Sequence, residues 1–121
     1  FGVRAPKDKQ EQMVYDLACK TAAMLGHEGA VQREDIFADC NYVGAGYGLP
    51  TDGMVEAVKM LAEMEGLLFD PVYTGKGLSG LIDWVRHGRF TKDDTVIFLH
   101  TGGSAALFGY PEAFALEGYT N

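Results

Sequence analysis

The 121 residues are enough for one domain of ordinary size or for part of a larger one. Their 47% apolar and 22% charged composition is typical of a soluble globular protein, and no apolar run is long enough to span a membrane. The formal net charge of -7 argues against a nucleic-acid-binding surface, which needs clustered lysine and arginine. We therefore expect no nucleic-acid partner and no membrane partner.

Helical periodicity divides the chain into helices that are separated by glycine-rich loops. The predicted helices cover residues 7–25, a stretch from an N-cap at Thr51 or Asp52 to Gly66, residues 76–87, and a last segment that starts from Ser104. Gly26 and Gly66 provide the left-handed conformation in which many helices end. We expect the helix that ends at Gly66 to bury an apolar stripe, which consists of Met54, Val55, Val58, Leu61 and Ala62.

Short apolar runs between these helices predict strands. They are residues 1–5, a brief stretch within residues 29–43, residues 67–69 and residues 95–99. The last two runs have no polar alternation, which is typical of strands buried on both faces of a parallel sheet. Strands that alternate with helices predict an α/β fold. We expect a single segment, residues 1–121, built as a three-layer parallel sheet with flanking helices and right-handed crossovers.

Three polar loops are candidates for a functional site, because ligands of parallel sheets bind beyond the carboxyl ends of the strands. DPVYTGK (70–76) follows one predicted strand, and HTGGS (100–104) follows another. The glycine-rich loop GAGYGLPTDG (44–53) is the third candidate, and it carries a tyrosine. The residues alone therefore predict an α/β domain with a polar site at its strand ends.

Each of these features also has a purely structural interpretation. Ser104 could be the N-cap of the last helix, with the glycines before it serving only a tight turn. Tyr47 and Tyr73 could be half-buried packing residues with solvated hydroxyls, and Lys76 a first-turn residue that faces water.

The cysteines, histidines and first residues carry further expectations. Cys19 and Cys40 lack CxxC spacing, so we interpret them as reduced thiols of a cytoplasmic protein, with a disulfide as the alternative. The three histidines show no metal-ligand spacing, and we predict no metal site. The chain begins FGVRAP with neither a methionine nor a signal peptide, which indicates a segment of a longer protein.

Three motifs in order, YGLP (47–50), DPVYTGK (70–76) and HTGG (100–103), give the chain a family resemblance. Residues 46–110 resemble the C-terminal part of the pyridoxal-phosphate enzymes called D-cysteine desulfhydrases. Close relatives of these enzymes are the L-cysteate sulfo-lyases and the 1-aminocyclopropane-1-carboxylate deaminases. The resemblance implies the tryptophan-synthase-β-like fold, pyridoxal-phosphate fold type II, in which this chain would form the C-terminal part of the larger cofactor-binding domain.

The resemblance also implies roles for particular residues. Tyr47 and Tyr73 match two catalytic tyrosines on the substrate side of the cofactor. Thr74, Thr101 and Gly102 match cofactor-binding positions, the two threonines beside the pyridine nitrogen. The deaminase branch has glutamate at the first threonine position and usually leucine at the second. A hydroxyl beside the ring nitrogen leaves the cofactor a milder electron sink than a carboxylate does. The threonines therefore favour β-elimination of a good leaving group.

The implied activity is that of a carbon–sulfur lyase on a small amino-acid substrate, in a homodimer that contains pyridoxal 5'-phosphate. D-cysteine would give pyruvate, ammonia and sulfide, or L-cysteate would give pyruvate, ammonia and sulfite. The family's Schiff-base lysine and phosphate loop would lie upstream of Phe1, and Lys76 does not match that lysine, so we expect the chain alone to be inactive. The alternatives are 1-aminocyclopropane-1-carboxylate deamination and a non-catalytic α/β domain that binds a small anion or a partner chain.

Overall fold

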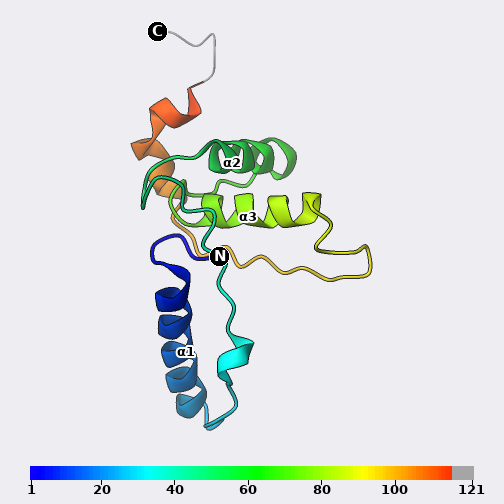
Figure 1. Ribbon diagram of the computed structural model, residues 1–121. Helices are drawn as coiled ribbons and strands as arrows, with labels where there is room; N and C mark the ends of the chain where they lie inside the picture. The colour runs from blue at the N-terminus through cyan, green and yellow to red at the C-terminus, as the bar shows by residue number, and fades with distance from the viewer. Residues whose placement is uncertain (116–121) are drawn as a thin grey trace.

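The computed structural model describes residues 1–115, which form three α-helices and three short 3-10 helices (Figure 1). In chain order they are α1 (Lys7–Met24), η1 (Arg33–Asp35), α2 (Asp52–Glu65), α3 (Thr74–Arg86), η2 (Ser104–Gly109) and η3 (Pro111–Phe114). Helices α2 and α3 lie side by side (Figure 1). Helix α1 extends away from them, and residues 25–38 run back along it; we call α1 and these residues the arm. Among residues 1–115, no helix combines the length and the apolar character that crossing a membrane requires.

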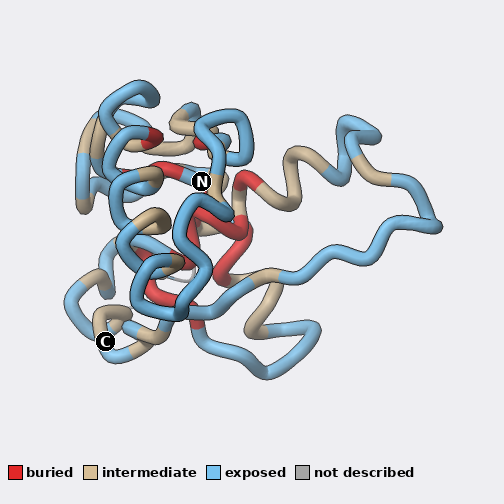
Figure 2. The backbone as a smooth tube through the Cα atoms, turned by 90° about the horizontal axis from the view of Figure 1, so that it is seen from below, coloured by how far each residue is buried: buried red, intermediate tan, exposed pale blue. Residues whose placement is uncertain are grey.

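The core lies between α2 and α3. The Thr51 hydroxyl accepts a hydrogen bond from the Met54 amide at 3.2 Å, and Gly66 ends α2 in the left-handed conformation at φ 67°. The predicted second helix is therefore confirmed. The core residues are Met54, Ala57, Val58, Phe69 and Leu78. Figure 2 shows that buried backbone is confined to a small part of the described chain.

Helix α1 confirms the prediction for residues 7–25, but its apolar stripe is not buried. Leu17 is 66% exposed and Met24 is 87% exposed. The periodicity of a helix indicates which side chains share a face, but not whether another element covers that face. Within the described residues, the face of α1 beyond its first turns has little to pack against.

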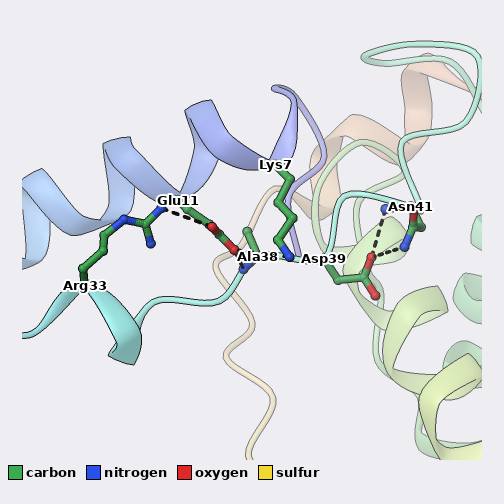
Figure 3. A network of polar contacts seen from close by, with 6 residues as sticks. All are labelled: Lys7, Glu11, Arg33, Ala38, Asp39 and Asn41. Atoms are coloured by element: carbon green, nitrogen blue, oxygen red, sulfur yellow. Dashed lines mark hydrogen bonds and ion pairs between the residues drawn. The ribbon is translucent and has the colours of Figure 1, made fainter.

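The arm is held together by a carboxylate near the start of α1. Glu11 is only 8% exposed, and it accepts hydrogen bonds from Arg33 Nη2 at 3.2 Å and from the Ala38 amide at 3.0 Å (Figure 3). The Ala38 amide bond is the main cause that holds the pKa of Glu11 below its ordinary value, and the Arg33 and Lys7 charges add to it. These contacts join α1 to the segment that returns along it.

The base of the arm is tied to α3 through Asp39. Its carbonyl accepts from the Gly2 amide at 2.7 Å, and its carboxylate accepts from Trp84 Nε1 at 3.0 Å. The Phe1 ring packs on the Trp84 ring, with 4.7 Å between the ring centres. The first residues of the chain thus lie against α3 and not in a strand.

The predicted three-layer parallel sheet is wrong for the described chain, because residues 1–115 contain no strand. The runs 67–69 and 95–99 are not paired with each other, and the backbone of 95–99 has no backbone hydrogen-bond partner among these residues. Ile97 and Leu99 are 88% and 79% exposed, whereas a strand buried on both faces would be covered. An apolar run favours a strand, but a sheet also needs a neighbouring backbone to bond to.

The ends of two other elements differ from their predictions. Helix α3 begins at Thr74, two residues before the predicted start, because the Asp70 carboxylate binds the free Thr74 amide at its first residue. The predicted last helix is two short 3-10 helices, since Gly109 and Pro111 interrupt a regular α-helix. Ser104 is not the N-cap of this segment, a position that Gly103 occupies at φ 90°.

Candidate active site

The turn from Asp70 to Thr74 is built around one buried carboxylate. Asp70 is 2% exposed, and its carboxylate accepts hydrogen bonds from the backbone amides of the next residues. The donors are Val72 at 2.8 Å, Tyr73 at 2.6 Å and Thr74 at 2.7 Å. Burial alone would raise the pKa of Asp70, but the Thr74 hydroxyl and these amides outweigh it, so the pKa lies below its ordinary value. The N-terminus of α3 is thus occupied by a carboxylate of the chain itself.

The hydroxyl of Thr74 belongs to the same turn. It donates to Asp70 Oδ1 at 2.6 Å and accepts from the Asp70 amide at 3.0 Å, and the residue is 4% exposed. Because a hydroxyl has one proton, Thr74 has none left to donate to a ligand while this bond is made. The structure places Thr74 in the wall of the site, with its proton directed to Asp70.

Tyr47 and Tyr73 come from different loops and meet at their hydroxyl groups. The two hydroxyls are hydrogen-bonded, and the ring centres lie 5.7 Å apart with the ring planes inclined by 63°. Both rings are about half exposed, Tyr47 at 50% and Tyr73 at 46%. The sequence predicted both residues for one site, and they are in contact although 26 positions separate them.

The environment of Tyr47 favours its protonated form. The hydrogen bond with Tyr73 is the main cause that raises the pKa of Tyr47 above its ordinary value, and desolvation adds to it. The Arg4 guanidinium, 5.9 Å from the centre of the Tyr47 ring, acts in the opposite direction. At neutral pH Tyr47 therefore keeps its phenol proton, which it can share or donate.

The loop of residues 100–104 lies against the Asp70 turn. A side chain at Gly103 would place its Cβ 3.2 Å from Asp70 Cβ, so this close approach needs glycine. The Ser104 hydroxyl donates to the carbonyl of Leu68 at 2.6 Å, which fixes the end of the loop beside residues 67–69. Thr101 is exposed, and its hydroxyl has no hydrogen-bond partner within residues 1–115. Thr101 is therefore the threonine of the site with a proton to offer.

A cavity of about 470 Å³ brings three of the predicted residues together. Tyr73, Thr74 and Thr101 line it, in the company of apolar and aromatic side chains such as Phe1 and Trp84. This volume is within the range of about 300–1,000 Å³ typical of small-molecule sites. Of the other predicted site residues, Tyr47 is attached to the cavity through Tyr73, and Gly102 follows Thr101 at φ 91° without lining it.

Two residues of the site had no functional prediction from the sequence. Asp70 orders the turn, and its signal was available, because aspartate side chains often bind the backbone amide two residues further on, as Asp70 binds that of Val72. Lys76 was interpreted as a lysine facing water, and this was wrong: its side chain is 0% exposed. No local sequence pattern predicted the burial of Lys76, because the carbonyls that accept its hydrogen bonds lie in the loop of residues 43–46.

The chain belongs to the family of pyridoxal-phosphate dependent enzymes, whose model matches residues 4–102. The matched range includes Tyr47, Tyr73, Thr74 and Thr101. The resemblance inferred from the three motifs is therefore confirmed at the level of the family.

Similar proteins include several D-cysteine desulfhydrases. The chain is 43% identical over 110 residues to the D-cysteine desulfhydrase of Salmonella newport (strain SL254). It is identical to the same extent to those of Salmonella heidelberg (strain SL476) and Salmonella typhi. Each match covers 91% of this chain and 33% of the relative, so the chain spans about a third of the length of these enzymes.

The residues around the cavity fit the ring side of the family's cofactor. Its apolar and aromatic walls suit a flat heteroaromatic ring, and the Thr101 hydroxyl can donate to a ring nitrogen. Tyr73 lies in the same wall, where its hydroxyl can face the substrate. Among the described residues the lining of this cavity contains no lysine.

Proposed function

We propose that the protein carrying this chain is a pyridoxal-phosphate dependent carbon–sulfur lyase. Its reaction converts D-cysteine and water to pyruvate, ammonia and sulfide, or L-cysteate and water to pyruvate, ammonia and sulfite. The observation that carries the proposal is the 43% identity to D-cysteine desulfhydrases over 91% of the chain. The hydrogen-bonded Tyr47–Tyr73 pair beside the cavity supports it.

In this proposal the chain supplies a contact to the cofactor ring, the proton donors and the apolar walls of the cavity. When bound, the cofactor provides an electron sink for the bond that breaks at the α-carbon. The Thr101 hydroxyl would donate a hydrogen bond to the ring nitrogen without protonating it, so that nitrogen would stay uncharged and the sink mild. A mild sink suffices where the leaving group is as good as sulfide or sulfite.

The tyrosine pair handles protons on the substrate side. Because the pKa of Tyr47 is raised, its phenol stays protonated at neutral pH and keeps the shared hydrogen bond supplied with a proton. Tyr73, which lines the cavity, can then pass a proton to a departing sulfur atom and recover one from Tyr47.

We also propose a setting for the protein: a cytoplasmic homodimer that acts on small amino acids, with this chain as part of its larger cofactor-binding domain. Cys19 and Cys40 are both free thiols, as a reducing compartment would keep them. Size-exclusion chromatography with light scattering tests the dimer, and a monomer at micromolar concentration would contradict it.

A product assay on the purified protein as its gene encodes it tests the function. We expect release of pyruvate and sulfide from D-cysteine, or of pyruvate and sulfite from L-cysteate. Tyr73→Phe should retain the cofactor absorption and lose most of the turnover. Formation of 2-oxobutyrate from 1-aminocyclopropane-1-carboxylate, with no sulfur release from either amino acid, would replace the proposal with the deaminase activity.

A further inference from the structure

Lys76 is a buried cation whose hydrogen bonds all end on one loop. It lies in the first turn of α3 and is fully buried. Its Nζ donates to the backbone carbonyl of Val43 at 2.5 Å and to that of Gly46 at 3.0 Å. Within residues 1–115 no carboxylate lies within ion-pair distance of this ammonium group.

Burial makes these two bonds costly to lose. The ammonium of Lys76 has given up water on burial, and this desolvation lowers its pKa. Hydrogen bonds from a charged donor are about twice as strong as neutral ones, and here they replace the lost hydration. A movement of the loop away from Nζ would therefore leave a buried charge without partners.

The loop in question carries Tyr47, the residue that directly follows Gly46. It contains Gly44 and Gly48 at φ 70° and 75° and no regular helix or strand, so few local contacts fix its path. On its far side the Tyr110 hydroxyl donates to the Gly48 carbonyl at 2.9 Å. Lys76 and Tyr110 thus hold the backbone on the two sides of Tyr47.

Lys76 is also fixed relative to the other tyrosine. Tyr73 is the N-cap of α3, and its carbonyl accepts from the Gly77 amide at 2.9 Å, within the turn that contains Lys76. One side chain therefore joins the backbone beside Tyr73 to the backbone beside Tyr47.

We propose that Lys76 is a positioning residue that holds the Tyr47 loop on α3 and so keeps the Tyr47 and Tyr73 hydroxyls in contact. This inference deepens the proposed function, since it concerns the same tyrosine pair. Lys76 does not line the cavity beside Tyr73, and its Nζ is directed at backbone carbonyls, so it does not touch the reacting atoms.

Hydrogen exchange tests the positioning without any assay of activity. Lys76→Met keeps the length of the side chain and removes its donors, and Lys92→Met is the matched control at an exposed lysine. In the whole protein we expect the amide of Leu49, which donates to the Gly46 carbonyl at 3.3 Å, to exchange at least about 10-fold faster in Lys76→Met, with α1 unchanged. Unchanged exchange in this loop, or an equal increase along the whole described chain, would overturn the proposal.

A double-mutant cycle tests the consequence for the tyrosine pair. If Lys76 acts through Tyr47, Tyr47→Phe should lower kcat about 10-fold in the native background and less than about twofold in Lys76→Met. Equal losses in both backgrounds would overturn the inference. A protein without lyase activity would refute the proposed function, and the exchange experiment would still decide the role of Lys76.

A second variant separates loss of positioning from loss of folding. Lys76→Gln keeps an amide donor and removes the buried charge, and we expect it to show loop exchange between that of the native protein and that of Lys76→Met. If circular dichroism shows both variants unfolded, Lys76 is a residue of general stability and the positioning role is refuted.

Discussion

Asp70 offers the sharpest test of how the site is built, because one carboxylate satisfies four donors. Replacing it by alanine leaves the amides of Val72, Tyr73 and Thr74 and the Thr74 hydroxyl without their acceptor. Loss of a helix cap costs about 0.5–2 kcal/mol. A buried hydroxyl without a partner adds about 1–3 kcal/mol. We therefore expect Asp70→Ala to lower the free energy of unfolding by about 3 kcal/mol.

Urea unfolding of the purified protein measures this effect as a change in midpoint at constant slope. Asp70→Asn keeps one oxygen acceptor and should cost about 1 kcal/mol, whereas the exposed Asp93→Ala should stay within about 0.5 kcal/mol of the native protein. If Asp70→Ala and Asp93→Ala unfold at the same urea concentration, the Asp70 turn is not the source of order that we infer.

The same carboxylate gives the effect a pH dependence. The pKa of Asp70 is lowered in the folded protein, so its contribution is fully present above the ordinary value of 3.8. It is lost as the pH falls through the lower, folded-state pKa. The stability difference between the native protein and Asp70→Ala should therefore shrink in acid and stay constant at neutral pH.

Three further predictions concern single hydroxyl groups. Thr101→Val should reduce cofactor retention and turnover without changing the circular dichroism, and unchanged cofactor content and kinetics would refute its contact with the ring nitrogen. Tyr73→Phe should lower kcat by ~10²-fold, and a loss of less than about threefold would make it a packing residue. Tyr42→Phe should cost about 1 kcal/mol, because the Tyr42 hydroxyl donates to Asp83 at 2.7 Å. Burial and the Asp83 bond raise the pKa of Tyr42 from 10.0 to about 12, so this cost should be complete below pH 10 and vanish as the pH rises through about 12. A cost that stays the same across that range in urea unfolding would contradict this assignment.

The features that the sequence predicted correctly are those whose causes are local. Helix α2 has its cap at Thr51, its apolar spacing and its terminal Gly66 within one short stretch, and each of these acts at the position where it is seen. The two tyrosines and Thr101 were proposed from motifs, and the cavity and the Tyr47–Tyr73 contact bring them to one place, while their roles stay predictions.

The features that could not be predicted from the sequence depend on distant or competing hydrogen-bond partners. Residues 95–99 have a strand-like composition, but pairing needs another backbone, and residues 1–115 provide none for them. Lys76 is buried because carbonyls some thirty positions away accept its protons. The proton of Thr74 is directed to Asp70, a partner that the motif did not indicate, and the place of Thr74 beside the ring nitrogen stays a prediction. In each case the structure depends on a group that lies outside the local sequence pattern.

A crystal structure of the protein with its cofactor tests the central claim most directly. The account predicts the pyridine ring in the cavity lined by Tyr73 and Thr101, with the ring nitrogen about 3 Å from the Thr101 hydroxyl. It also predicts the Tyr47–Tyr73 pair on the substrate side, still joined by its hydrogen bond. A ring bound away from this cavity, or a ring nitrogen that faces another side chain, would contradict the account.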